Sequence, residues 1–316
     1  MGKINVLYTF DSKFWRLAAV AINSLMAHRD TNTEITVYCM VAPFTRGKKK
    51  IKQIVTSQGG NLVWRKIRKR ENPYRKYDYS RWSPVIFYRL FAHRIFQDID
   101  KILYLDSDTL VQTDMRELFD IDISQYALGA VRDMAPTEDP DSYAGKYVRE
   151  FKEQYLKNDL YVNSGVLLIN LKKMLEFEQD LTNVKIALRY PDQDIINVAL
   201  DGKILELPLR YNFIPDRLCS AKFSKDAYID AVKRPAIYHF YAIKPYIYHL
   251  NSRETYAMFA NAARAVGMYP DQFRAGLIKR KTTKLKTPIP FVYIDKNNII
   301  RIGPLRIESR HVRFVQ

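Results

Sequence analysis

Residues 101–113 read K-I-L-Y-L-D-S-D-T-L-V-Q-T. The four apolar residues at 102–105 predict a short strand that is buried on both faces, as in a parallel sheet. This run ends directly in Asp106 and Asp108, and charged side chains are rarely buried unless they are paired or bound to a metal. The carboxyl ends of such strands are also where open α/β sheets bind ligands. The pair therefore predicts oxygen ligands for a hard divalent cation that carries phosphates, with ordinary turn chemistry as the alternative.

The residues before this strand predict a β-α-β-α-β alternation. Strands are expected at residues 4–10, 34–41 and 61–67, and helices at residues 14–28 and 45–58. Such an alternation is typical of a Rossmann-like open sheet flanked by helices. No G-x-G-x-x-G motif follows the first strand, so phosphates are not expected to be held in the dinucleotide manner. Asp11 stands where that loop would lie.

Further elements are expected on both sides of the acidic pair. A helix at residues 83–96 leads into the central strand and carries Arg89, for which an ion pair with the aspartates is favoured over a plain surface charge. The polar residues 134–158 predict a loop that covers the site or binds an acceptor. The other expected elements are a short helix from 115 to 119, strands at 127–132 and 161–171, helices at 172–189, 191–200 and 256–266, and short extended pieces at 204–208 and 211–214.

The composition indicates a folded protein with a polyanionic partner. The chain has 316 residues, 47% of them hydrophobic, and a formal net charge of +17. Such a charge favours nucleic acid, an anionic membrane or a phosphorylated substrate. No RNP-like, helix-turn-helix or zinc-binding pattern is present, which argues against nucleic acid. The two cysteines, Cys39 and Cys219, the lack of a signal peptide and the lack of an apolar run of about 20 residues predict a cytoplasmic protein.

The basic residues gather in two segments. Residues 65–76 hold seven Lys or Arg and one Glu, and residues 274–316 hold eleven Lys or Arg and two acidic residues. A β-hairpin is expected at residues 291–302. We therefore expect a main domain at residues 1–268 and a basic appendage at 269–316. Peripheral attachment to an anionic membrane is one interpretation of both segments, and a solvated loop with a soluble hairpin packed on the body is the other.

Four motifs, taken in order, resemble those of family 8 glycosyltransferases. They are L-Y-L-D-S-D-T-L-V at 103–111, Y-V-N-S-G-V-L-L-I-N-L at 161–171, D-Q-D-I-I-N at 192–197 and R-Y-N-F at 210–213. The resemblance covers roughly residues 3–250. It implies a retaining enzyme of GT-A fold, in a family that includes bacterial lipopolysaccharide galactosyl- and glucosyltransferases and glycogenin. The donor would be a UDP-hexose, with galactose or glucose favoured, and the acceptor a saccharide or a lipid-linked sugar.

The resemblance also implies a metal site. Asp106, Asp108 and His239 match the ligands of Mn²⁺, with Mg²⁺ as the alternative ion, bound to the donor diphosphate. Taken alone, a histidine after an apolar run is more often a satisfied core residue than a ligand. Lys244 follows five positions later and would contact the β-phosphate.

The nucleoside and sugar contacts are likewise implied by the resemblance. Thr9, Asp11 and Phe14 match the nucleoside-binding segment, and Ser107 would lie at the ribose. The residues that would hold or line the donor hexose are Arg89, Asp133, Asn163, Asp192 and Gln193. From the residues alone, a plain helix-capping role for Asp192 is the alternative.

The sequence departs from the family pattern in places. The segment after His239 is one residue shorter than usual, Ala242 stands near an expected glycine, and Tyr246 replaces a tryptophan. These changes leave a catalytically silent sugar-nucleotide-binding protein as the alternative function. Arg81 stands where related galactosyltransferases have a histidine on the acceptor side, so a different acceptor is expected.

The expected chemistry follows from the residue under the anomeric carbon. Gln193 matches this position, and an amide is a poor nucleophile, unlike the nucleophilic carboxylate of retaining glycosidases. We therefore expect front-face displacement, in which the acceptor attacks on the side from which the diphosphate leaves. Asp192 would orient the sugar hydroxyls and help to stabilise the positive charge on the ring.

Overall fold

The computed structural model describes residues 2–77, 83–134, 142–186, 188–215, 231, 233–241, 244–247 and 252–274, together with the backbone of three short strands after residue 291. The chain divides into two compact units, Met1–Arg274 and Ala275–Gln316. Arg81, Cys219 and Ala242, which the sequence analysis singled out, lie outside the described residues.

The first part of the larger unit is the predicted β-α-β-α-β alternation. β1 (Gly2–Phe10) pairs in parallel with β2 (Thr33–Val41), and β2 pairs in parallel with β3 (Asn61–Lys66). The crossovers are α1 (Trp15–Ala27) and α2 (Lys48–Ser57). The parallel pairing brings the carboxyl ends of these strands to one edge of the sheet, which is the usual ligand-binding edge of an open α/β sheet.

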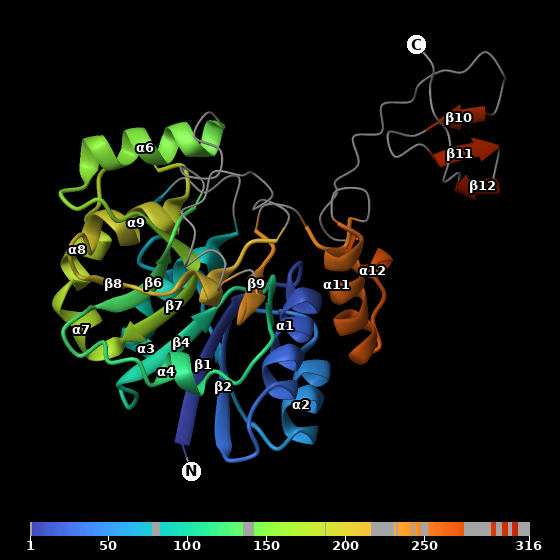
Figure 1. The fold of residues 1–316 in the computed structure, drawn as a ribbon, viewed down its shortest axis with the longest axis horizontal. Helices are drawn as coiled ribbons and strands as arrows, with labels where there is room; N and C mark the ends of the chain where they lie inside the picture. Colours follow the sequence, from blue (N-terminus) through green and yellow to red (C-terminus); the bar gives the residue numbers. More distant parts are fainter. Residues whose placement is uncertain are drawn as a thin grey trace. The chain divides into compact units, whose positions relative to one another are not determined.

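The main sheet is mixed but mostly parallel (Figure 1). In the described part of the chain it has seven strands in the order β3-β2-β1-β4-β7-β6-β8. β4 (Lys101–Leu105) is parallel to β1, and β8 (Ile204–Glu206) is parallel to β6 (Leu128–Arg132). β7 (Val162–Asn170) runs antiparallel to both β4 and β6. The predicted Rossmann-like sheet flanked by helices is confirmed.

The sheet separates two hydrophobic clusters, because successive side chains of a strand point to opposite faces. Ile4, Val6 and Tyr8 of β1 belong to the cluster that also holds the buried residues of α1 and α2. Leu7 of β1 and Tyr104 of β4 belong to the other cluster, with apolar residues from the segments before β4 and after β7. The central strands are therefore buried on both faces, as their continuous apolar runs predict.

A second, two-stranded sheet lies beyond the end of β4. β5 (Thr109–Val111) follows the acidic pair and runs antiparallel to β9 (Ile237–His239), with Thr109 opposite His239. The buried hydroxyl of Ser24 in α1 fixes β5, since its Oγ accepts from the Val111 N–H at 3.0 Å. This ribbon brings His239 beside the acidic pair, although the two are far apart in the sequence.

The helix expected at residues 83–96 has a different winding. It is a 3₁₀ helix, η2 (Pro84–Phe91), followed by a single α-helical turn, α3 (Ala92–Ile95). Most side chains of η2 are buried, including the guanidinium-bearing Arg89, whose Nε donates to the Ile86 carbonyl at 3.0 Å. A 3₁₀ helix has three residues per turn, so residues three apart lie on the same side. We attribute this winding to packing against neighbours on several sides of η2, which the spacing of apolar residues in the sequence does not show.

The prediction of a loop at residues 134–158 is wrong for its second half. α6 (Tyr143–Tyr155) occupies it, and the Ser142 hydroxyl caps the helix by accepting from the Gly145 N–H at 2.9 Å. Val148 and Phe151 form the buried face of this helix. The many Lys, Arg, Glu and Gln residues of the segment concealed a narrow apolar stripe at helical spacing.

Two further expectations need correction. Residues 172–189 were expected to form one helix, but the structure has two short ones, α7 (Leu171–Glu176) and α8 (Glu178–Thr182), which end near residues of weak helix propensity. The extended piece expected from residue 211 instead begins inside a 3₁₀ turn, η3 (Leu209–Asn212), which follows Pro208. The remaining elements of the larger unit are η1 (Lys69–Glu71), α4 (Arg116–Phe119), α9 (Pro191–Ala199), α11 (Arg253–Ala265) and α12 (Asp271–Arg274).

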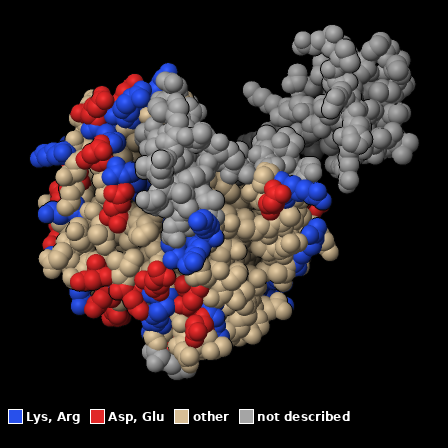
Figure 2. Space-filling model, viewed as in Figure 1, with Lys and Arg blue, Asp and Glu red and all other residues tan. Residues whose placement is uncertain are grey.

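The smaller unit contains a three-stranded antiparallel sheet. β10 (Val292–Ile294) pairs antiparallel with β11 (Ile299–Ile302) within the segment where a hairpin is predicted, and β12 (Leu305–Glu308) adds a third strand. Within the described residues, no helix has both the length and the apolar character that crossing a bilayer requires. On the face that Figure 2 shows, described basic and acidic side chains are interspersed.

Replacing Ser24 by Ala tests how β5 is fixed. We expect Ser24→Ala to lower the free energy of unfolding by about 1–3 kcal/mol, because the buried Val111 N–H loses its acceptor. The measurement is urea unfolding of the full chain. Ser57→Ala, which removes only a hydroxyl bond to Ile54 within α2, is the control and should change stability by well under 1 kcal/mol. Equal effects of the two substitutions would contradict the prediction.

Candidate functional site

Two aspartates and one histidine meet where β4 ends. Asp106 follows β4, Asp108 precedes β5, and His239 is the last residue of β9. One ligand atom from each residue lies within 4.8 Å of the other two. His239 Nε2 stands 3.5 Å from Asp106 Oδ2 and 3.5 Å from Asp108 Oδ1. Ligand atoms that share one cation at about 2.0–2.6 Å stand at such separations.

His239 Nε2 is the atom that favours a metal site over a plain cluster of charges. The imidazole is 1% exposed, and its buried Nε2 has no hydrogen-bond partner. The two carboxylate oxygens at 3.5 Å are too far for good hydrogen bonds to Nε2. A divalent cation between them would give the nitrogen and both carboxylates a common partner, so the residues present fit a divalent metal.

A chain of amide hydrogen bonds orients the imidazole. The Gly165 N–H donates to Asn163 Oδ1 at 3.0 Å, which fixes which end of that amide is the oxygen. Asn212 Nδ2 then donates to Asn163 Oδ1 at 2.9 Å, so Asn212 Oδ1 faces His239 Nδ1 at 2.8 Å. His239 Nδ1 must therefore carry a proton, which leaves the lone pair of Nε2 for a metal when the ring is neutral.

Gly165 also makes room for the ring. A Cβ at this position would lie 2.1 Å from His239 Cε1, which no side chain could tolerate. The His239 imidazole therefore packs directly against the Gly165 backbone. Gly165 also supplies the N–H group that begins the chain of amide hydrogen bonds.

The charges of the site shift the pKa values of its members. Burial alone would lower the pKa of His239, but Asp106 and Asp108 outweigh burial and raise it to about 9. Burial would raise the pKa of both aspartates, yet Arg89 and His239 lower that of Asp106, and Lys244 and His239 lower that of Asp108. At neutral pH the metal-free site thus holds two carboxylates and an imidazolium. A metal requires the neutral ring, so metal binding releases this proton.

Arg89 connects Asp106, a candidate metal ligand, to the neighbouring strand and helix. Its side chain is almost completely buried, and Nη2 stands 2.9 Å from Asp106 Oδ1, the ion pair that the sequence predicted. Nη1 donates to the Ser164 carbonyl at 2.7 Å and lies 3.4 Å from Asp192 Oδ2. The guanidinium also lies 4.2 Å over the ring of Tyr104, whose hydroxyl donates to Asp106 Oδ1 at 2.5 Å.

The first turn of α9 faces this site. Asp192 does not cap the helix, since the N-cap is Tyr190 and makes no side-chain bond. Asp192 Oδ2 instead accepts from the Ser164 hydroxyl at 3.0 Å, and burial raises the pKa of this carboxyl while Arg89 opposes the rise. Gln193 bridges two strands, because its Oε1 accepts from the Ser164 N–H at 3.1 Å and its Nε2 donates to Asp133 Oδ2 at 3.0 Å.

Asp194 and Asn197 fix α9 in place, a role that sequence reasoning missed although both belong to the quoted D-Q-D-I-I-N motif. Asp194 is fully buried and accepts from the hydroxyls of Tyr147 and Tyr161 and from the N–H groups of residues 189 and 190. Asn197 bonds both the N–H and the carbonyl of Val162 at the start of β7. These bonds fix the position of α9, and with it the positions of Asp192 and Gln193 in the site.

Ser107, expected at the ribose, and Thr9, expected in the nucleoside-binding segment, lie close to β4. Ser107 is buried and its hydroxyl donates to the Thr9 carbonyl at 3.4 Å. Thr9 Oγ1 lies 3.2 Å from the hydroxyl of Tyr104. Tyr104 therefore contacts both the end of β1 and Asp106, and nothing in its apolar run signalled this role.

The loop after β1 is held by Asp11. Its Oδ1 accepts from the N–H groups of Lys13 at 2.7 Å and Phe14 at 3.3 Å, and its Oδ2 accepts from the Ser83 hydroxyl at 2.7 Å. Phe14 is partly buried beside the cluster that contains α1. In this structure Asp11 therefore shapes the loop with its own side chain, rather than leaving both oxygens open.

Lys244 lies beside Asp108, a candidate metal ligand. Its Nζ stands 2.6 Å from Asp108 Oδ2 and 3.5 Å from the Phe240 carbonyl. Two residues on, Tyr246 is buried and stacks on Phe273 with ring centroids 5.9 Å apart. The tyrosine that replaces the family tryptophan thus anchors the segment in an aromatic cluster, and the shorter segment still brings the ammonium to the site.

The family model described as glycosyl transferase family 8 matches residues 5–248. The chain belongs to this family. The match contains every site residue described above.

Proteins of similar sequence agree with this assignment. A "Putative glycosyltransferase" of Haemophilus influenzae is 27% identical over 252 residues, which cover 75% of this chain and 71% of that protein. The lipopolysaccharide 1,2-glucosyltransferase of Escherichia coli K12 is 31% identical over 140 residues, or 42% of this chain and 39% of that enzyme. The protein is accordingly a glycosyltransferase.

A solved structure supports the fold. The galactosyltransferase LgtC, in complex with donor and acceptor sugar analogues, superposes with a TM-score of 0.69 and 23% sequence identity. The match covers 87% of this chain and all of that one. The GT-A fold that the family 8 resemblance implied is thereby confirmed.

Removing the amide that orients His239 tests the metal site of this family 8 protein. We expect Asn212→Leu to weaken Mn²⁺ binding about 10–100-fold, because the imidazole loses the acceptor that fixes its tautomer. Isothermal titration of the full chain measures the affinity, and the melting temperature reports folding. Asn183→Leu, at an exposed position, is the matched control. Unchanged Mn²⁺ affinity in a folded Asn212→Leu chain would show that the amide chain does not orient a ligand.

Proposed function

We propose that this family 8 protein is a retaining hexosyltransferase that moves galactose or glucose from a UDP-sugar to an acceptor with the help of Mn²⁺. The observation that carries the proposal is the convergence of Asp106, Asp108 and His239 around an unpartnered Nε2. Oxygen and imidazole ligands suit Mn²⁺, and Mg²⁺ is the alternative ion. Bound there, the ion would offset the negative charge that develops on the leaving diphosphate.

Lys244 supplies a second positive charge to the leaving group. In the metal-free chain its ammonium pairs with Asp108. When a cation occupies the site it takes over the charge of Asp108, and the ammonium can then turn to the β-phosphate without leaving a carboxylate unpaired. This arrangement supports the role that the resemblance implied for Lys244.

The nucleoside would lie along the ends of β1 and β4. There the Ser107 hydroxyl donates to the Thr9 carbonyl, so the two residues lie side by side where they would contact the ribose. Asp11 holds the loop that carries Phe14, so the aromatic ring is positioned to lie beside a uracil base. Breaking the contact between Asp11 and Ser83 would free a carboxylate oxygen for the donor.

The hexose would lie over the first turn of α9. Asp133 and Asn163 line this region through their bonds to Gln193 and to each other. The Gln193 side-chain oxygen presents a partial negative charge without being a good nucleophile, which favours front-face displacement over a covalent intermediate. Arg89 favours the ionised form of Asp192 against the burial that raises its pKa, and the carboxylate would stabilise positive charge on the ring.

The acceptor is proposed to be a saccharide or a lipid-linked sugar. The relative from Escherichia coli is named for lipopolysaccharide, which supports an acceptor of that class in envelope polysaccharide synthesis. The basic residues 269–316 would then form an appendage that attaches the enzyme peripherally to the inner face of an anionic membrane, where each cation contributes about 1 kcal/mol. Deleting residues after Met268 should reduce sedimentation with anionic vesicles if this is correct.

A catalytically silent sugar-nucleotide-binding protein is the second candidate. It is favoured by the altered segment from His239 to Tyr246. Hydrolysis of UDP-galactose and UDP-glucose in Mn²⁺ without acceptor distinguishes the two, because a silent protein binds these donors but does not cleave them.

Replacing a metal ligand tests the proposal. We expect Asp108→Asn to lower donor hydrolysis and Mn²⁺ affinity about 100-fold or more, since the amide cannot neutralise a divalent cation. The assay is UDP release in a panel of UDP-sugars. Asp98→Asn, an exposed aspartate outside the site, should behave as wild type. Full hydrolysis by Asp108→Asn would end the proposal of a metal-dependent transferase.

Substitutions in α9 test the assigned roles. Gln193→Ala should lower kcat about 100-fold with little change in KM, because the dipole that stabilises the charged ring is lost. Asp192→Asn should also lower kcat, and Gln125→Ala, at an exposed position, serves as the control. Near-full turnover by Gln193→Ala together with a dead Asp192→Asn would show that the roles are reversed.

A further inference from the structure

A pocket of about 340 Å³ lies next to β9 on the side away from the metal ligands. Tyr238 lines it, and because neighbouring residues of a strand point to opposite faces, Tyr238 points away from the face that His239 uses. The other lining residues come from the end of β5, from η3 and from the segment before β9: Gln112, Thr113, Arg210, Lys233, Arg234 and Pro235. None of these residues takes part in the site described above.

The pocket carries an excess of positive charge. Arg210 is paired with Glu117, whose two carboxylate oxygens lie 3.3 and 3.4 Å from Nη1. Lys233 and Arg234 are exposed and form no ion pair with any carboxylate in the described part of the chain. Among the residues that the structure describes, these three cations are therefore paired with one carboxylate, that of Glu117.

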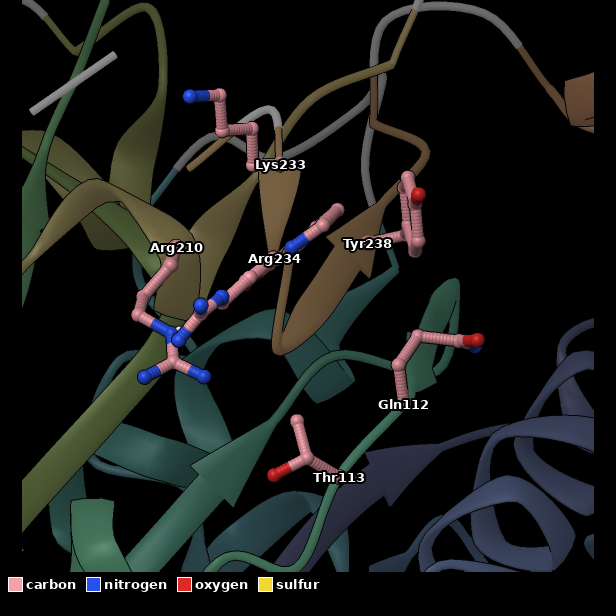
Figure 3. Close-up of a pocket in the computed structure, with 7 residues that line it drawn as sticks. Gln112, Thr113, Arg210, Lys233, Arg234 and Tyr238 are labelled. Carbon is pink, nitrogen blue, oxygen red and sulfur yellow. Dashed lines mark hydrogen bonds between the residues drawn. The ribbon is translucent and has the colours of Figure 1, made fainter. Parts of the chain in front are cut away.

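The two arginines are close to one another. The Arg210 Nε donates to the Arg234 carbonyl at 3.3 Å, and in Figure 3 the Arg234 side chain runs toward the guanidinium of Arg210. Like charges held together repel, and an anion between them would turn this repulsion into attraction. The Thr113 side chain also borders the pocket and adds a hydroxyl.

We propose that this pocket is a second anion site that binds a phosphate monoester, separate from the donor diphosphate. Planar guanidinium groups bind phosphate oxygens through paired N–H donors. A phosphate monoester carries more negative charge than a diester, which better balances the three cations of the pocket. Binding here uses cations alone, so it requires no divalent metal and does not depend on the proposed transferase activity. The monoester belongs either to a soluble phosphorylated compound or to a lipid headgroup.

Phosphate binding to metal-free protein tests the proposal. The full chain is titrated with inorganic phosphate in EDTA at constant ionic strength, and the melting temperature gives the half-saturating concentration. The pocket variant is Lys233→Gln with Arg234→Gln. The control, Lys49→Gln with Lys52→Gln on the exposed side of α2, removes the same charge elsewhere. We expect the pocket variant to raise the half-saturating concentration about tenfold or more and the control less than about twofold.

A second arm identifies the source of the phosphate. Sedimentation with vesicles that contain phosphatidic acid, a monoester, is compared with vesicles that contain phosphatidylglycerol, a diester. If the pocket variant loses phosphate binding and also its preference for phosphatidic acid, the ligand is a lipid headgroup. If it loses phosphate binding alone, the ligand is a soluble phosphate. If the pocket variant binds phosphate as tightly as the control, the proposal is overturned whatever the vesicles show.

Discussion

The site depends on one buried cation. Arg89 places its guanidinium between Asp106 and Asp192 and beside the Ser164 carbonyl. Burying carboxylates without a counter-charge would cost several kcal/mol each, and Arg89 supplies that counter-charge to Asp192 and, together with His239, to Asp106. Because Arg89 comes from η2 and its partners from the ends of β4, β7 and α9, the same ion pairs that keep the carboxylates charged also hold these elements together. The ion pairs of Arg89 therefore determine both the charge state of the carboxylates and the geometry of the site.

Around that cation, backbone groups decide how each side chain faces. The Gly165 N–H fixes the amide of Asn163, which fixes Asn212, which in turn fixes the imidazole of His239. The Gly165 N–H thus sets the direction of the lone pair on His239 Nε2 through three successive hydrogen bonds. β9 contributes to two surfaces at once, since His239 faces Asp106 and Asp108 while Tyr238 lines the basic pocket on the other side. An ion at either surface would act on the same short strand.

The sequence predicted the main sheet well, because continuous apolar runs at residues 4–10 and 102–105, each ending in polar residues, are typical of buried strands. It failed where packing overrides periodicity or where polar residues hide a pattern. The winding of η2 follows from burial on several sides, and the narrow stripe of Val148 and Phe151 in α6 was lost among charged neighbours. At the site, the aspartate pair was recognisable from its place after a strand, whereas Tyr104 and Asn212 were not singled out, since a tyrosine in an apolar run and an asparagine in a turn are ordinary.

By itself the sequence determined the β-α-β-α-β order of the first part of the sheet, the acidic pair at the end of the central strand and, through four motifs, the family. These are local or ordered features of the chain, so they can be read without coordinates. Only the tertiary structure decided that His239 approaches Asp106 and Asp108 to 3.5 Å, that Lys244 reaches Asp108, and that Arg210 and Arg234 border a common pocket. Such contacts join residues that are distant along the chain, and their geometry is set by strand pairing and side-chain hydrogen bonds that no local pattern encodes.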